Sequence, residues 1–218
     1  MRKIQLILLF SLVTLFNAGA QSKLGLKFSP MVASNRVSLV DSVYDVEPIG
    51  SAFKFSLGLI YDHELTETYF LSTGLIFVPK YFGVEVSAEP GEGGTPPAEP
   101  KQEYRLNYLQ IPLSLKLFTN EIQPDTRVFF QVGLAPEIQI FNEPVEEDYD
   151  LIENFKGFDT TILFGGGVEY RAGINTTLFA SVTYQRGLSN VIKTEIQGFE
   201  EELFVRNTVV SFDIGIKF

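Results

Sequence analysis

The sequence predicts an all-β protein, an eight-stranded antiparallel up-and-down transmembrane β-barrel. Three observations lead to it. Apolar and polar residues alternate with a period of two along the chain, long and short links follow one another strictly, and 20 Phe and 9 Tyr occur without any Trp. Alternation is typical of strands with one apolar face, and aromatic residues are enriched in strands. After the first twenty residues, no apolar run reaches the ~20 residues of a spanning helix.

Eight runs carry the alternation. The C-terminal run is the clearest, because Val210, Phe212, Ile214, Ile216 and Phe218 are apolar and the residues between them are polar or small. The eight runs are 24–29, 53–59, 69–77, 108–117, 128–140, 162–171, 178–184 and 210–218. The runs 69–77, 108–117, 162–171 and 210–218 contain 9 or 10 residues, which matches the ~9–11 residues of a tilted membrane strand. An even number of strands puts both termini on one side of a closed barrel.

The links between these runs alternate in length. The long links are 33–51, 81–103, 142–156 and 188–204, and the short ones are 62–67, 119–126 and 173–175. Outer-membrane barrels have long extracellular loops and short periplasmic turns, so we expect periplasmic termini. Within the second long link, residues 90–97 are of low complexity and have little to bury.

The first twenty residues have the organisation of a secretory signal peptide. Arg2 and Lys3 precede an apolar stretch (4–16), and Ala18-Gly19-Ala20 forms a small-residue cleavage site. Cleavage before Gln21 leaves residues 21–218 as one barrel domain. Without the two signal charges, 15 Lys and Arg stand against 27 Asp and Glu, and this acidic balance argues against a nucleic-acid partner.

The polar face of the strands is expected to fill a narrow lumen, while the apolar face contacts lipid. By alternation, eight charged side chains point inward, and opposite signs there would pair, as buried charges require. These residues are Lys27, Lys54, Lys116, Glu137, Glu169, Arg171, Asp213 and Lys217. Because side chains just fill an eight-stranded barrel, we expect a structural polar network. An ion-conducting path is the alternative.

Aromatic residues occur at the ends of the runs on the apolar face, as in the girdles of membrane barrels. Those at one end are Tyr61, Tyr69, Tyr170 and Phe218, and those at the other are Phe53, Phe77 and Tyr184. Three prolines, Pro30, Pro112 and Pro136, lie inside predicted strands. Because proline cannot donate to the ladder, we expect bulges or strand ends at these positions.

Three segments resemble the PorT-like outer-membrane β-barrel family of Bacteroidota. They are the signal ending in Ala20-Gln21, the stretch 109–116 (LQIPLSLK) and the terminal 214–218 (IGIKF), and the glycine-rich 165–170 agrees. The resemblance covers the mature chain. It implies an outer-membrane location in contact with lipid, and Phe218 as the signal that the barrel-assembly machinery reads. The family's namesake is associated with protein secretion, which implies an accessory subunit of a secretion complex as an alternative role.

No constellation of residues typical of an enzyme is present. His63 is the only histidine and lies in a short turn beside Glu64, where we expect it to be solvated and where no partner for acid–base catalysis is implied. With one His and no Cys, a zinc or redox site is not expected, nor is any cofactor. Gly165–Gly167 lacks the Lys and Ser or Thr of a phosphate loop.

The long links are acidic. One contains Glu143, Glu146, Glu147, Asp148, Asp150 and Glu153, and another contains Glu200, Glu201 and Glu202. Such carboxylates can bind Ca²⁺ or bridge to lipopolysaccharide phosphates, but a solvated loop explains them more simply. We therefore predict a non-enzymatic barrel with a structural or surface-binding role through its extracellular loops. The polar inner face counts against a soluble lipid-binding barrel.

Overall fold

The computed structural model describes residues 22–39, 44–88, 101–144, 156–191 and 203–218. These residues form ten strands: β1 (Ser22–Leu39), β2 (Tyr44–Pro48), β3 (Ser51–Glu64), β4 (Tyr69–Ala88), β5 (Lys101–Gln110), β6 (Leu113–Gln123), β7 (Thr126–Pro144), β8 (Phe158–Arg171), β9 (Thr177–Gly187) and β10 (Leu203–Lys217). No helix in this part of the chain is long and apolar enough to span a membrane. The predicted signal peptide, residues 90–97 and the acidic residues of 146–153 and 200–202 lie outside the described ranges.

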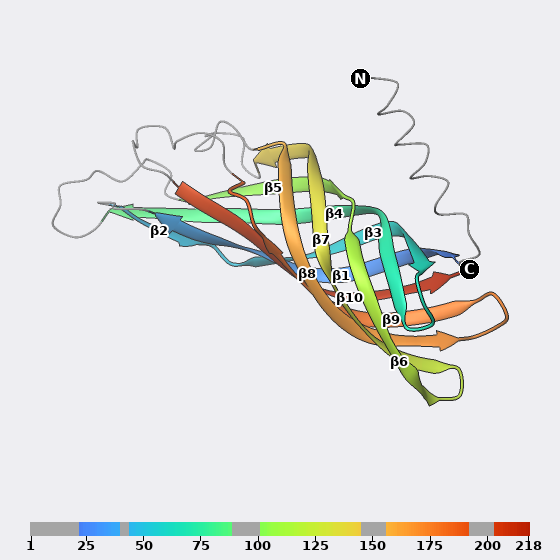
Figure 1. The fold of residues 1–218 in the computed structure, drawn as a ribbon. Helices are drawn as coiled ribbons and strands as arrows, with labels where there is room; N and C mark the ends of the chain where they lie inside the picture. The colour runs from blue at the N-terminus through green and yellow to red at the C-terminus, as the bar shows by residue number, and fades with distance from the viewer. Residues whose placement is uncertain (1–21, 40–43, 89–100, 145–155, 192–202) are drawn as a thin grey trace, which may run out of the picture.

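The strands form one closed antiparallel barrel (Figure 1). β1 pairs with β3, and β3 pairs with β4. Further along the chain, β7, β8, β9 and β10 pair in that order, and β10 pairs with β1 to close the sheet. β5 and β6 act as one strand, since both lie between β4 and β7. The barrel therefore has eight strands, and the predicted fold is confirmed. β2 is extra and pairs with the far end of β4.

The barrel has two different ends. At the turn end, the described links 65–68, 124–125 and 172–176 are short, and the C-terminus lies at this end too. At the loop end, several strands continue through residues that the sequence predicts as links. β1, β4 and β7 contain 18, 20 and 19 residues, whereas about 9–11 suffice to cross a bilayer. The far ends of β2 and β4 project together, away from the C-terminus (Figure 1).

The projecting strands are joined to one another. The side-chain amide of Asn35 in β1 donates a hydrogen bond of 2.9 Å to the carbonyl of Gly83 in β4, and the Ile49 amide donates to the same oxygen at 3.0 Å. Val191, which is buried, donates from its backbone to Val205 of β10 at 3.0 Å. The loop end is thus an ordered wall in its described part.

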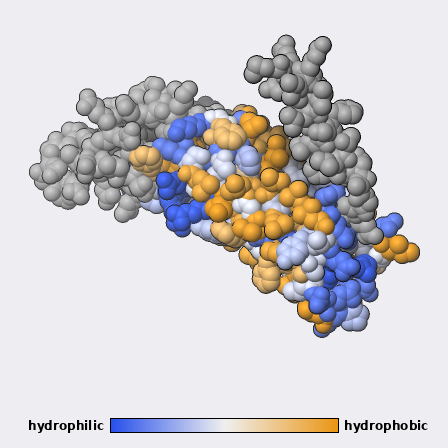
Figure 2. Space-filling model, viewed as in Figure 1, coloured by the Kyte–Doolittle hydropathy of each residue, from blue (hydrophilic) through white to orange (hydrophobic). Residues whose placement is uncertain are grey.

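An apolar belt covers the outside of the barrel. Phe53, Val182 and Phe212 are 63%, 54% and 51% exposed. Figure 2 shows apolar surface over the middle of the barrel and hydrophilic surface toward both ends. Among the predicted girdle residues, Tyr69, Tyr170, Phe218, Phe53 and Phe77 are exposed, and Tyr61 and Tyr184 are half-buried. Exposed apolar surface of this extent suits lipid rather than water.

The three prolines interrupt the hydrogen-bond ladder, and only one of them ends a strand. Pro112 lies in the break between β5 and β6, as predicted. Pro136 lies inside β7, but its carbonyl accepts from the Ile111 amide at 2.9 Å, so its missing donor faces the same break. Pro30 lies inside β1, where pairing with β10 stops at Phe28 and resumes at Met31. The expectation of bulges was wrong for Pro30 and Pro136, because a gap in the ladder accommodates the lost donor without any change of register.

We predict that Val182→Arg lowers the free energy of unfolding in lipid vesicles by about 2–4 kcal/mol, as charges on the lipid face of a barrel do. Val182 is half-exposed in β9, so in a water-soluble protein the same change would stay within about 0.5 kcal/mol. Urea unfolding, followed by loss of the fast-migrating folded band on unheated SDS gels, measures the difference.

Ile174→Arg is the matched control, because Ile174 is 99% exposed in the last turn. It should leave the unfolding midpoint unchanged. Equal effects of the two substitutions would contradict a lipid-facing belt.

Candidate functional site

The lumen is the most elaborate polar site of the described residues, and its turn-end half is organised around Asp62. Lys116 Nζ lies 2.9 Å and Lys217 Nζ 2.5 Å from Oδ2 of this carboxylate, and the Ser72 hydroxyl donates to Oδ1 at 2.5 Å. Lys217 also pairs with Glu169. All five residues are buried. One carboxylate thus holds two ammonium groups, and the two acidic residues balance the two lysines.

Aromatic rings surround this cluster and screen it from water. Lys217 Nζ lies 5.1 Å from the ring centroid of Phe179, and Lys116 Nζ lies 5.3 Å from that of Phe129. Phe129 also contacts Phe118, with ring centroids 5.5 Å apart, and the guanidinium of Arg127 lies 4.5 Å from the Phe118 centroid. Cations over aromatic faces are favourable, and more so away from water.

The middle of the lumen contains a second pair of opposite charges. Lys27 Nζ lies 3.6 Å from Oδ2 of Asp213, which also accepts a hydrogen bond of 2.6 Å from the Thr183 hydroxyl. Gln131 in turn donates to the Thr183 oxygen at 3.1 Å. This chain connects β1, β10, β9 and β7 across the interior.

A third polar group lies toward the loop end. Lys80 forms an ion pair with Glu137, and both are buried. The Gln110 amide donates to Glu137 at 2.7 Å and to Gln185 at 2.8 Å, and the Thr161 hydroxyl donates to Glu137 at 3.1 Å. Buried polar groups are costly unless partnered, and these strands supply partners from opposite walls.

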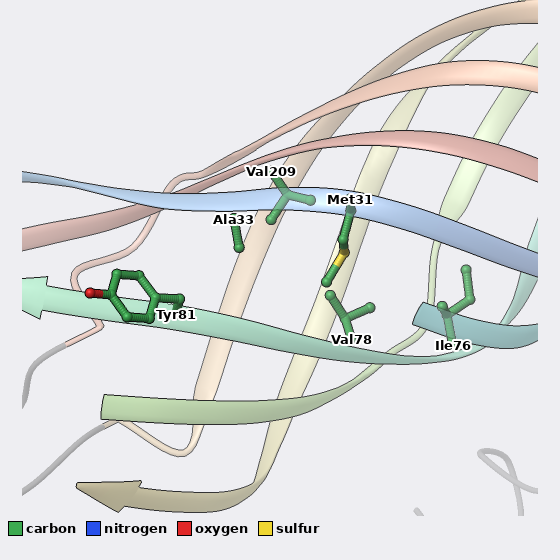
Figure 3. Packing of buried hydrophobic residues seen from close by; sticks show 6 residues of the cluster. All are labelled: Met31, Ala33, Ile76, Val78, Tyr81 and Val209. Atoms are coloured by element: carbon green, nitrogen blue, oxygen red, sulfur yellow. The ribbon is translucent and has the colours of Figure 1, made fainter. Parts of the chain in front are cut away.

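An apolar cluster fills the loop-end interior on the side of β1, β4 and β10. It consists of Met31, Ala33, Ile76, Val78, Tyr81 and Val209 (Figure 3). Figure 3 shows the side chains of Met31 and Val78 pointing toward one another between their strands. The loop-end half of the lumen is therefore filled by apolar packing on one side and by hydrogen-bonded charge on the other.

Little free space is left between these groups. The internal cavity among Lys27, Gln110, Lys116 and Asp213 measures about 40 Å³, which is room for very few water molecules. Inner glycines contribute to this density: a Cβ added at Gly167 would lie 2.2 Å from the Ala180 carbonyl oxygen, and one at Gly215 would lie 2.2 Å from that of Leu26. Neighbouring strands approach at these positions only because no side chain is there.

Most of the predicted inward charges lie in the lumen, and one of them lies outside it. Lys27, Lys116, Glu137, Glu169, Asp213 and Lys217 lie in the three groups above, and Lys54 is half-buried in β3. The prediction was wrong for Arg171. It is half-exposed at the last residue of β8, 3.8 Å from Glu121 and 3.7 Å from Asp125, because the strand has already left the barrel interior there.

Sequence reasoning missed two central members of the lumen, Asp62 and Lys80. Both lie on the inner parity of their strands, but the predicted strands ended at Leu59 and Phe77, before reaching them. Continuing the alternation by three residues in each strand would have found both. His63 was also misplaced: it is buried inside β3, its ring 6.4 Å from that of Tyr61, and is not a solvated turn residue.

An open cavity lies at the turn end of the barrel. It measures about 970 Å³, and its lining carries both signs of charge, with Lys23, Arg127, Glu64 and Glu67 beside Phe70. Lys23 Nζ donates to the Thr177 hydroxyl at 3.0 Å. In the described residues, no three His, Asp or Glu side chains converge as they would to hold a metal ion.

Comparison with known proteins gives the family and the architecture. Residues 17–193 match the model of the outer membrane protein beta-barrel domain family. Neisserial surface protein A is similar in structure at 14% identity and a TM-score of 0.51, over 92% of this chain and 99% of that one. OprG from Pseudomonas aeruginosa is similar at 12% identity and a TM-score of 0.54, over 92% and 98%. No curated protein matches the sequence.

We predict that Asp62→Asn lowers the free energy of unfolding by about 3–5 kcal/mol, the usual cost of removing one partner of a buried ion pair. The substitution leaves Lys116 and Lys217 with too little compensating charge. Urea unfolding in lipid vesicles measures the effect.

Asp125→Asn is the control, since it removes a carboxylate from a half-exposed ion pair with Arg171. Its effect should stay below about 1 kcal/mol. If Asp62→Asn cost no more than this control, the lumen network would contribute nothing to stability.

Proposed function

The chain belongs to the outer membrane protein beta-barrel domain family, and from this premise we propose that it is a non-enzymatic barrel with a closed lumen, whose loop end displays a binding surface outside the cell. In this role the barrel anchors and spaces the surface, and lipid is its permanent partner. The signal peptide, periplasmic termini and Phe218 as the assembly signal belong to the same proposal.

The filled lumen is the observation that carries the proposal. Among the described residues, three groups of opposite charges and one apolar cluster fill the lumen, and the cavity between them measures about 40 Å³. A channel needs groups that bind an ion weakly enough to release it, whereas here the ammonium groups of Lys27, Lys80, Lys116 and Lys217 each contact a carboxylate. The arrangement therefore supports a structural network over a conducting path.

The loop-end projection supports display rather than simple anchoring. β1, β4 and β7 have nearly twice the residues needed to cross the bilayer, and β2 broadens the sheet formed by β4 and β5 beyond the belt. Rigid scaffolds that present variable loops are a common way to build binding surfaces.

In planar lipid bilayers, we expect the purified full-length mature barrel to show no steady ionic conductance, with an open trimeric porin as reference. The folded state is checked first by its mobility on unheated SDS gels. A reproducible conductance from the folded protein would contradict a closed lumen.

Display is tested on the same protein in intact cells. The chain has no cysteine, so Arg105→Cys, exposed at the loop end, and Ile174→Cys, exposed at the turn end, each introduce a single label site. A membrane-impermeant maleimide should label the first in intact cells and the second only after the outer membrane is permeabilised. The reverse pattern would overturn the proposed orientation.

An accessory subunit of a secretion complex is the second candidate, and the turn-end cavity is the observation that favours it. Its volume of about 970 Å³ and its lining of both charges suit a protein segment from the periplasmic side. The resemblance to the PorT-like family points in the same direction.

We predict that, if this second role applies, a photo-crosslinking amino acid at Ile174, beside the cavity, captures one periplasmic or membrane protein in near-stoichiometric yield. The same amino acid at Val182, on the lipid face, serves as control. Absence of a specific adduct at Ile174 would remove the secretion role.

A further inference from the structure

Three arginines gather on the outer face of the barrel near its loop end. These are Arg36 of β1, Arg206 of β10 and Arg186 of β9, and all three are exposed. Their sequence neighbours Asn35, Gln185 and Asn207 occupy inner positions and are buried. The arginines therefore point outward, on the parity of the apolar belt. They lie on three strands that are consecutive around the barrel.

The strand register brings these three charges together. Arg36 and Arg206 are direct cross-strand partners, which puts their Cβ atoms about 5 Å apart. Thr208 pairs with Arg186, so Arg206 and Arg186 are diagonal neighbours at about 7–8 Å. Like charges directly opposite one another on a sheet are destabilising. The register thus creates a concentration of positive charge that requires anions.

The described strands around the arginines supply no anion on this face. The outward positions of β1, β3, β8, β9 and β10 contain no Asp or Glu along their described lengths. At the centre of the group lies Thr208, which pairs with Ser34 on one side and Arg186 on the other. Its hydroxyl oxygen is buried and has no hydrogen-bond partner among the described residues.

The position of the arginines at the edge of the apolar belt indicates which kind of molecule carries the anionic group. Val32, Val210 and Tyr184 form one cross-strand row of the belt, and Arg186 and then the Arg36–Arg206 pair follow within two to four residues along the same outer face. The exposed Phe53 extends this row, because it pairs with Val32. The exposed Phe212 follows two residues beyond Val210, on the side of the row away from the arginines. The charges therefore begin where the apolar surface ends, at the level of lipid headgroups.

We propose that Arg36, Arg186 and Arg206 form a site for the phosphate groups of a phosphorylated glycolipid in the outer leaflet. Guanidinium groups bind phosphate through paired N–H donors, and the adjoining belt accommodates the acyl chains of the same molecule. Thr208 and Ser34 lie between the arginines as further hydroxyl partners. The site rests on the proposed orientation, in which the loop end faces outward, and adds a specific lipid contact to it.

The test uses the full mature barrel folded into phosphatidylcholine vesicles with or without bisphosphorylated lipid A. A ligand that binds the folded state raises the unfolding midpoint, and we expect lipid A to raise it by roughly 3–8 °C. Lipid A with its phosphates removed should give little of this rise. Loss of the folded band on SDS gels after heating reports the midpoint.

The variant R36Q/R186Q/R206Q should lose the rise, and R105Q/R171Q should keep it, since Arg105 and Arg171 are exposed arginines outside the cluster. In the wild type, the rise should also shrink at high salt, because exposed charges are screened. Persistence of the rise in the triple variant would overturn the proposal.

Three other results would also overturn it. If the arginines pair with the chain's own carboxylates, the triple substitution lowers the unfolding midpoint, relative to the wild type, by the same amount in phosphatidylcholine vesicles with and without lipid A. If they bind a soluble polyanion, inositol hexakisphosphate gives the wild type the same rise without lipid A. An equal rise with dephosphorylated lipid A would show that the acyl chains alone are responsible. Because vesicles carry lipid A in both leaflets, none of these results depends on orientation, which the maleimide labelling tests separately.

Discussion

The requirement that every backbone amide and carbonyl be hydrogen-bonded without water underlies the whole structure. In a bilayer only a helix or a closed sheet meets it, and here β10 returns to β1 to close the sheet. The same requirement explains the placement of the prolines. Pro112 and Pro136 share one interruption of the ladder, so two missing donors cause a single local gap instead of two.

Closure creates an interior that must be filled, and the chain fills it with charge rather than with apolar side chains alone. Because the lipid-facing positions are apolar, the alternating positions that face inward carry the polar residues of each strand. Buried charge is tolerable when it is paired, and Asp62 shows how far the pairing is shared, since one carboxylate contacts lysines from β6 and β10. Strands distant in sequence are thereby tied across the lumen.

Much of the fold could be predicted because period-two alternation is a local property. Eight runs, their order and the inward parity of Lys116, Glu169 and Lys217 follow from neighbouring residues alone. The ends of the strands could not be predicted in the same way. Beyond the belt, apolar contrast fades while hydrogen bonding continues, so β1 and β4 extend past their predicted limits. Asp62 was therefore left in a link, and Lys80 was left just past the end of a predicted strand.

The sequence by itself determined which face of each strand meets lipid, since alternation fixes parity whatever the neighbours are. The tertiary structure decided which inward charges meet, because pairing depends on strand register and on the curvature of the closed sheet. It therefore took Arg171 out of the lumen at the end of β8 and placed Arg36 opposite Arg206 on the outer face. The ion pair between Lys217 and Asp62 joins residues 155 positions apart, a separation across which no local pattern carries information.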